Sequence, residues 1–235
     1  MPLTGETQVD LTPEPADGAT EQVAASLYRH HLHAARHLAD LACELEKEHA
    51  GSAADAEVIR QHRAYVIGAI LATSAFLEAS INELYLEVQD HTSNGSPGGR
   101  RRVLAVPAHF WSAVARPPIL HKYQLALVVA DAEPFDEARP PFRDADGLIA
   151  LRDALVHGRL EWRDSHGRRQ NLERRLRAKF PHNAFATESD PEFPDQLLGA
   201  GCAMWAVRVA ERFSTEFCSR MAIPARGVAA REAAP

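Results

Sequence analysis

The sequence of 235 residues contains only three cysteines, Cys43, Cys202 and Cys218. Each lies alone within an apolar pattern of helical type, and no two are spaced as Cys-x-x-Cys. Paired cysteines form the disulfide frameworks of small secreted proteins, so their absence argues against that class of protein. We interpret the three thiols as reduced side chains in the core of a cytoplasmic protein.

The sequence also lacks the motifs of several common enzyme classes. It has no Gly-rich phosphate loop, no recognisable Ser-His-Asp arrangement, no internal repeat and no coiled-coil heptads. Its first residues lack the basic start and apolar run of a signal peptide. The longest apolar interval, residues 65–77, includes Gly68, Thr73 and Ser74 and is too short to cross a bilayer. We therefore expect a cytoplasmic protein with no membrane-spanning segment.

An excess of positive charge is also absent, because 26 Lys and Arg residues face 32 Asp and Glu residues, for a net charge of -6. A nucleic-acid site would therefore have to come from local clustering of basic residues. The length and the 46% hydrophobic content predict one globular domain. We expect a disordered segment over residues 1–18, a single helical domain over residues 19–222 and a flexible tail over residues 223–235.

Helical periodicity dominates the pattern within this domain, and there is almost no strand signal. The main helices are predicted over residues 20–50, 53–89, 119–130, 146–158, 172–180 and 195–221, with a short one starting at Pro107. We place Ser52 as the cap of the second of these helices. In the first, the apolar side is predicted to consist of Val23, Leu27, Leu38, Leu41 and Leu45. The fold class predicted is all-α, an antiparallel bundle of five to six helices.

The helix over residues 146–158 carries the most informative side chains. Leu148, Leu151 and Leu155 recur at three- and four-residue spacing, and Ile149 and Val156 would widen this buried stripe. Asp144 or Asp146 is placed to cap the start of the helix, and Gly158 is placed to end it.

Three polar residues, Arg152, Asp153 and His157, are set into that apolar pattern. Asp153 and His157 are four residues apart, about 40° around the helix, so their side chains are expected to meet. Arg152 lies about 7.5 Å along the axis from His157, within reach of a long side chain. Such a pair suits phosphodiester chemistry, because the imidazole can move protons while the guanidinium stabilises charge on phosphate oxygens. The alternative is a solvated helix face on which His157 caps the C-terminal end.

The segment Arg152-Asp153-Ala154-Leu155-Val156-His157 resembles the Arg-polar-x-x-x-His signature of the HEPN superfamily of all-helical domains. The stretch Phe76-Leu77-Glu78-Ala79-Ser80-Ile81-Asn82-Glu83-Leu84 is similar to an earlier long helix in such proteins, and the resemblance covers roughly residues 55–220. It implies a metal-independent endoribonuclease that leaves 2',3'-cyclic phosphate and 5'-hydroxyl ends. His157 would act as general base or general acid, Arg152 would stabilise the pentacoordinate phosphate, and Asp153, where Asn is commoner, would orient or help charge His157.

The resemblance also implies a homodimer in which two motifs face each other, so that a second His157 supplies the missing proton-transfer role. Such proteins often act as toxins in toxin-antitoxin or antiphage systems, which implies an antitoxin protein as a partner. No metal or other cofactor is expected.

Two further groups of residues are candidates for binding. Glu78 and Asn82 are four residues apart on the helix over residues 53–89, where they would contact the motif helix or a nucleotide, or form a satisfied polar pair between helices. Residues 158–180 contain eight basic and three acidic side chains. This local excess follows the motif directly, and it predicts an RNA-binding edge that includes Arg159, Arg163, Arg168 and Arg169.

Two alternatives of other classes remain. The first is a catalytically inactive HEPN-like module that binds or scaffolds, in which the motif stabilises a dimer or a helix end. The second is a metal-dependent helical enzyme that uses His30, His33 and His37, which share one helix face at metal-ligand spacing. The two arginines of that segment, Arg29 and Arg36, would oppose a cation, and no carboxylate lies on the same turn.

Overall fold

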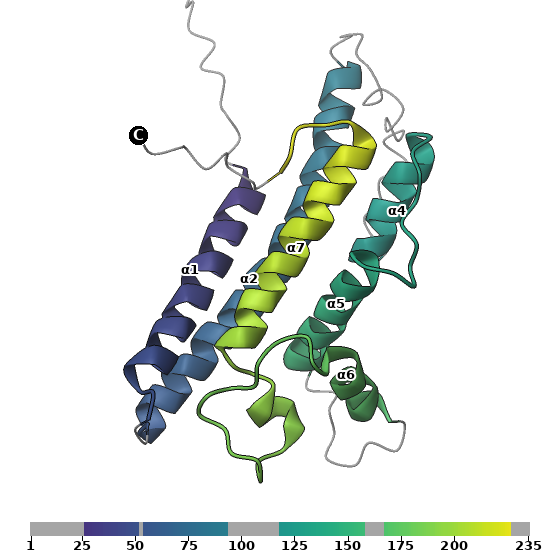
Figure 1. Ribbon diagram of the computed structural model, residues 1–235. Coiled ribbons are helices and arrows are strands. Elements are labelled where there is room, and N and C mark those ends of the chain that lie inside the picture. The colour runs from purple at the N-terminus through teal and green to yellow at the C-terminus, as the bar shows by residue number, and fades with distance from the viewer. Residues whose placement is uncertain (1–25, 52–53, 94–117, 158–166, 227–235) are drawn as a thin grey trace, which may run out of the picture.

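The computed structural model describes residues 26–51, 54–93, 118–157 and 167–226 (Figure 1). Within these ranges every regular element is helical and there is no strand, which confirms the predicted all-α class. The elements, seven in number across the described ranges, are α1 (Leu27–Glu48), α2 (Ala56–Ser93), α4 (Ile119–Val129), α5 (Phe142–His157), α6 (Arg168–Leu176), the short kinked segment η3 (Glu192–Gln196), whose backbone is extended at Phe193, and α7 (Ala200–Met221). The predicted helix starting at Pro107 lies outside the described residues.

The helices α1, α2 and α7 lie side by side (Figure 1). Helices α1 and α2 are antiparallel, because Ser26 bonds to Glu83 at one end of the pair and Glu46 bonds to His62 at the other. Helices α2 and α7 are parallel neighbours. Arg63 near the start of α2 pairs with Asp195, and Arg226, which follows α7, pairs with Glu87. The predicted bundle is therefore antiparallel only in part.

Helix α5 packs against α2, α4, α6 and α7. It runs antiparallel to α7, since Phe142 at its start contacts Phe213 while Gly147, further along, lies beside Trp205. The fully buried Tyr123 of α4 joins this layer to the others. Its hydroxyl donates to the carbonyl of Leu77 at 2.8 Å, and its ring meets Phe213 edge-on at 4.9 Å.

The buried face of α1 differs from the prediction. Its buried side chains are those of Tyr28, Leu32, Ala35, Ala39 and Ala42. Leu27 is 59% exposed, and Leu38, Leu41 and Leu45 are only half-buried. Three of the five buried side chains are alanines, while the half-buried Leu38 lies against Gly68 of α2.

Asp55, rather than Ser52, caps α2. Its carboxylate accepts hydrogen bonds from the backbone N–H groups of Glu57 and Val58, both at 2.9 Å, while Ser52 lies outside the described residues. The stretch Ala56–Glu87 of this helix is long and apolar enough to cross a membrane, although half of its most apolar part is buried inside the protein. A helix that is packed on several sides within a protein can be as apolar as a membrane-spanning helix.

The chain after α7 stays on the bundle for several residues. Ile223 packs against the core, and Arg226 is 6% exposed. The Arg226 guanidinium donates to the Ser80 carbonyl at 3.1 Å, pairs with Glu87 and lies over the Tyr28 ring. Ile223 and Arg226 thus contact the bundle, although the tail was predicted to begin at residue 223. Residues 1–18 and 227–235 lie outside the described residues.

Candidate active site

Helix α5 starts four residues earlier than predicted, at Phe142, after a cis Pro140-Pro141 bond. Asp144 and Asp146 therefore lie inside the helix and do not cap it. Asp144 accepts from Lys179 at 2.6 Å, and Asp146 accepts from Arg175 at 2.8 Å. These ion pairs tie the start of α5 to the segment around the end of α6.

The buried face of α5 follows the predicted stripe through most of its length. Leu148 and Leu151 are fully buried, and Ile149 and Leu155 are half-buried against the core. Val156 is 49% exposed, so the prediction that it widens the buried stripe is wrong. The last turn of α5 is thus covered by protein on one side only, within the described part of the chain.

The three motif residues lie at this open end of the helix. His157 is the last residue of α5, and it is exposed. The Arg152 side chain is 31% exposed and that of Asp153 51% exposed. Both the imidazole and the guanidinium are therefore accessible from solvent among the described residues.

Asp153 bonds to Arg152 rather than to His157. The Arg152 guanidinium donates to the Asp153 carboxylate at 2.8 Å, and no described hydrogen bond joins Asp153 to His157. The predicted Asp153–His157 contact stays a prediction, since one Asp153 oxygen is taken by Arg152. A permanently charged guanidinium competes better for a carboxylate than an exposed imidazole does. One Asp153 oxygen occupies part of the guanidinium, which has further N–H groups to offer a ligand.

The proposed auxiliary residues lie on α2, away from these contacts. The Asn82 amide oxygen accepts a hydrogen bond from the Lys122 ammonium of α4 at 2.9 Å, and Lys122 is only 2% exposed. Glu78 is half-buried. Neither side chain bonds to α5 in the described structure, so Asn82 serves as a polar bridge between α2 and α4. A contact of either residue with a nucleotide stays a prediction.

The predicted RNA-binding edge is described only at its end. Arg159 and Arg163 lie outside the described residues, and the side chain of Arg168, the first residue of α6, does too. Arg169 pairs with Glu173 at 2.9 Å within α6. The solvent-facing basic side chains that the structure describes in this segment lie further along the chain, from Arg174 to Lys179.

The histidines of α1 form no metal site in the described part of the protein. His30, His33 and His37 are exposed, and the rings of His33 and His37 stack at 6.5 Å. Across the described residues, no group of three His, Cys, Asp or Glu side chains is placed to hold a metal ion.

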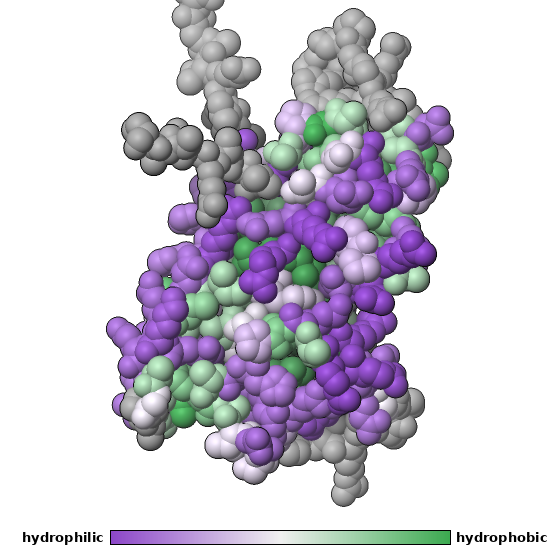
Figure 2. Space-filling model, viewed as in Figure 1, coloured by the Kyte–Doolittle hydropathy of each residue, from purple (hydrophilic) through white to green (hydrophobic). Residues whose placement is uncertain are grey.

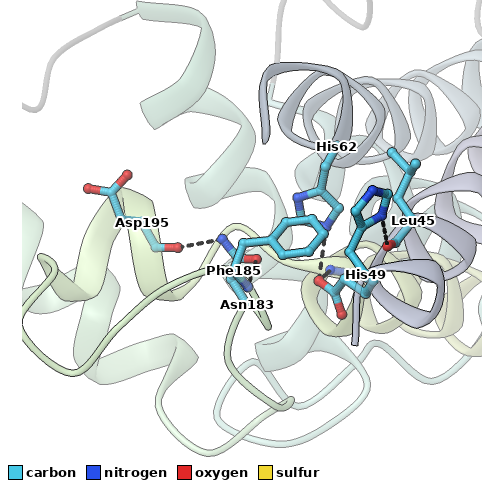
Figure 3. A network of polar contacts seen from close by, with 8 residues as sticks. Leu45, His49, His62, Asn183, Phe185 and Asp195 are labelled. Carbon is cyan, nitrogen blue, oxygen red and sulfur yellow. Dashed lines mark hydrogen bonds and ion pairs between the residues drawn. The ribbon is translucent and has the colours of Figure 1, made fainter. Parts of the chain in front are cut away.

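A buried polar network that the sequence did not reveal joins α1, α2 and the start of α7 (Figure 3). The Glu46 carboxylate accepts from the His62 ring at 2.9 Å and from the Ala200 N–H at 2.8 Å. His62 is 1% exposed, and Phe185 packs edge-on against its ring at 4.8 Å. Burial alone would raise the pKa of Glu46, but the hydrogen bonds from His62 and Ala200 outweigh it and lower that pKa.

Within the described residues no fully buried side-chain nitrogen or oxygen lacks a hydrogen-bond partner, so the buried groups of this network are satisfied by protein, which favours a structural role over catalysis. The only signal in the sequence is a histidine inside an apolar helix, and it does not identify a partner 16 residues away.

Comparison of the chain with protein-family models, with curated proteins and with solved structures found no match in any of the three. A fold class alone does not determine an activity, because many functions share one fold. The function must therefore be inferred from the chemistry of the residues themselves, and the open end of α5 carries the groups with the clearest chemistry.

Proposed function

We propose that this protein is a metal-independent endoribonuclease of HEPN type. The observation that carries the proposal is the placement of an accessible guanidinium, Arg152, and an accessible imidazole, His157, on the last turns of one helix of an all-α protein. The likeness of Arg152-Asp153-Ala154-Leu155-Val156-His157 to the HEPN signature supports the assignment. The substrate is RNA, and the products carry 2',3'-cyclic phosphate and 5'-hydroxyl ends.

Cleavage of this kind needs two proton transfers and one anion-stabilising group. A general base takes the proton of the ribose 2'-hydroxyl, whose oxygen attacks the adjacent phosphorus, and a general acid gives a proton to the departing 5'-oxygen. His157 performs one of these transfers. Arg152 holds the two phosphate oxygens that gain charge in the pentacoordinate transition state.

One imidazole cannot be base and acid in the same step, so the proposed enzyme is a homodimer with two motifs facing one phosphate. The exposed Val156 beside His157 supports a contact at this end of α5, since an apolar side chain next to the site gains from being covered by a second subunit. By its resemblance to HEPN proteins, the proposed biological role is that of a cytoplasmic toxin or defence effector held by an antitoxin protein.

A second candidate is a catalytically inactive HEPN-like binding or scaffold module. The Arg152–Asp153 ion pair favours it, because the carboxylate competes with phosphate for the guanidinium and adds negative charge at the site. This candidate predicts that RNA stays intact, while His157→Ala lowers the melting temperature or dissociates the dimer.

The test is incubation of the purified protein with single-stranded RNA in excess chelator, with end-group analysis of the products. We expect Arg152→Ala and His157→Ala to lower the cleavage rate by about 100-fold or more, the usual contribution of such groups. Asp153→Asn should retain cleavage, because it frees the guanidinium and restores the commoner residue.

The matched control is Arg29→Ala, which removes an exposed arginine of α1. It should cleave like the wild type. Equal rates for the wild type, Arg152→Ala and His157→Ala would exclude the nuclease.

A further inference from the structure

A basic groove lies between the start of α5, the segment that ends α6 and the face of α7. It consists of two adjoining pockets of about 430 and about 390 Å³. Asp144, Lys179 and Trp205 line both pockets, so the two lie side by side. We call this pair of pockets the basic groove. Hydrophilic residues gather over α5 and α6 on the face shown in Figure 2.

The groove concentrates positive charge in a protein that is acidic overall. The first pocket is lined by five basic side chains, Arg143, Arg174, Arg175, Arg177 and Lys179. The second adds Arg208 and Arg212. Against these stand three carboxylates, those of Glu137, Asp144 and Asp146. The excess of basic side chains attracts anions, although the net charge of the chain is -6.

Internal ion pairs neutralise only part of this charge. Lys179 pairs with Asp144, Arg175 pairs with Asp146, and Arg177 pairs with Glu192, which lies outside the two pockets. Arg143, Arg208 and Arg212 are exposed, and among the described residues none of their side chains forms a hydrogen bond or an ion pair. Guanidinium groups gathered without counter-charges repel one another, and a bound anion relieves that repulsion.

The floor of the groove is rigid and apolar. Trp205 is 5% exposed and packs against Phe180, with 5.3 Å between the ring centroids. The arginines around this floor can meet phosphate oxygens in fork geometry, each guanidinium offering two parallel N–H donors.

One part of the first pocket, at Asp146, lies on the same side of α5 as the motif, whereas Asp144, which lines both pockets, lies about 160° around the helix from Asp146. Asp146 lines the groove, and Asp153 and His157 follow it at seven and eleven residues, within about 20° of the same line along the helix. They lie about 10 Å and about 16 Å further along the axis. A strand that carries one phosphate per roughly 3.4 Å of stacked length spans that distance with several phosphates.

We infer that the basic groove binds the phosphate backbone of a single RNA strand, several nucleotides away from the bond positioned at His157. The inference rests on the proposed function for the identity of the ligand. Backbone contacts of this kind fix the register of the strand without reading its sequence. The groove thus places RNA at the open end of α5, while Asp144 and Asp146 keep the basic side chains in position when RNA is absent.

The experiment measures binding of the full chain to a fluorescein-labelled single-stranded RNA with 2'-O-methyl groups, by fluorescence anisotropy at several salt concentrations. This RNA has no free 2'-hydroxyl, so binding is read without cleavage. We expect the double variant Arg208→Gln with Arg212→Gln to bind more weakly. The slope of log affinity against log salt should fall in magnitude by about 1.4, or about 0.7 for each phosphate that the variant no longer neutralises.

Asp146→Asn provides a change in the opposite direction, since it frees Arg175 and removes a negative charge from the groove. This variant should bind RNA more tightly than the wild type. If the Arg175–Asp146 pair were purely structural, the substitution would not raise the affinity for RNA. The charge-matched control is Arg29→Gln with Arg60→Gln, two exposed arginines outside the groove, which should bind like the wild type.

Several outcomes overturn the inference: equal binding by the groove variant and the control, binding that does not depend on salt, or binding of tripolyphosphate or anionic vesicles in place of RNA. Failure of the nuclease proposal looks different. In that case natural RNA stays uncut, yet the groove variant still weakens binding of the methylated strand. If the wild type cleaves RNA and the groove variant binds the methylated strand as well as the wild type does, the groove inference is excluded and the nuclease proposal stands.

Discussion

Glu46 and His62 form a buried pair whose contribution to stability depends on pH. The pKa of Glu46 is lowered in the folded protein, so the unfolded chain takes up its proton at a higher pH than the folded one does. The pair therefore stabilises the fold fully above the ordinary glutamate pKa of 4.5, and this contribution is lost as the pH falls through the lower folded value.

We expect Glu46→Gln to lower the free energy of unfolding by about 1 to 3 kcal/mol near neutral pH, the usual worth of a hydrogen bond to a charged group. The variant should also lose stability less steeply than the wild type below about pH 4.5, because it has no proton to gain there. Urea denaturation across that pH range measures both effects. Parallel stability curves for the two proteins would show that Glu46 does not titrate with folding.

At this scale the sequence identified the exposed motif side chains but not their partners. Arg152 and His157 could be placed at the end of a helix because helical spacing is a local property. Asp153 has two candidate partners, the Arg152 guanidinium and the His157 imidazole, and the spacing of the residues alone does not decide between them. The pairs of Asp144 and Asp146 join residues 35 and 29 positions apart, a separation that no local pattern encodes.

Gly147 and Gly201 lie on helices near the groove, and they differ in how much space an added side chain would find. A Cβ atom at Gly147 in α5 would lie 3.9 Å from Leu176 and Trp205, which is ordinary contact. A Cβ atom at Gly201 in α7 would lie 2.7 Å from the Pro181 carbonyl oxygen, a backbone atom that cannot move aside cheaply. The same substitution should therefore have opposite signs in the two helices.

We expect Gly147→Ala to be neutral or to stabilise the protein by up to about 1 kcal/mol, through the better helix propensity of alanine. Gly201→Ala should destabilise it by about 1 to 3 kcal/mol, because the clash outweighs that gain. Thermal and urea unfolding of the two variants, side by side, gives the comparison. Equal shifts would mean that the Pro181 loop yields to the added methyl group.

The helices themselves were predicted well and their ends less well. Helical segments could be located because apolar periodicity is local, but ends depend on caps and loops that the tertiary structure selects. The last helix was expected from residue 195, yet α7 begins at Ala200. The chain before it forms η3 and lies close to the Asn183 backbone, which only a glycine at position 199 permits. In α1 the buried face consists of Tyr28, Leu32 and three alanines, whereas Leu27, Leu38, Leu41 and Leu45 lie outside it.

For the whole molecule, the proposed two-subunit site makes activity depend on assembly. A mixed dimer with one His157 lacks either the base or the acid, so it should be inactive. An excess of the His157→Ala variant is mixed with wild-type protein and subunits are allowed to exchange. The mixture should cleave RNA more slowly than wild-type protein diluted with the same volume of buffer.

The control is Arg29→Ala protein added in the same amount. It should not lower the cleavage rate of the wild-type protein, and its own cleavage should add to the total rate. Cleavage that stays proportional to the amount of wild-type chain, together with a monomer by light scattering, would contradict the shared site.

The fold class followed from the sequence, but the arrangement of the helices did not. An apolar stripe shows that a helix has a buried face without showing which helix covers it. The parallel packing of α2 and α7 depends on contacts such as that of Arg63 with Asp195, which come from distant parts of the chain. The basic excess over residues 158–180 includes four residues of the groove, but the contributions of Arg143, Arg208 and Arg212 could not be predicted, because they meet that segment only in three dimensions.

The ends of the described fold meet on one short stretch of α2. Ser26 bonds to Glu83, and Arg226 bonds to the carbonyl of Ser80 and lies over the ring of Tyr28. A peptide tether between these two ends would need to cross only this corner, so the bundle is suited to circular permutation.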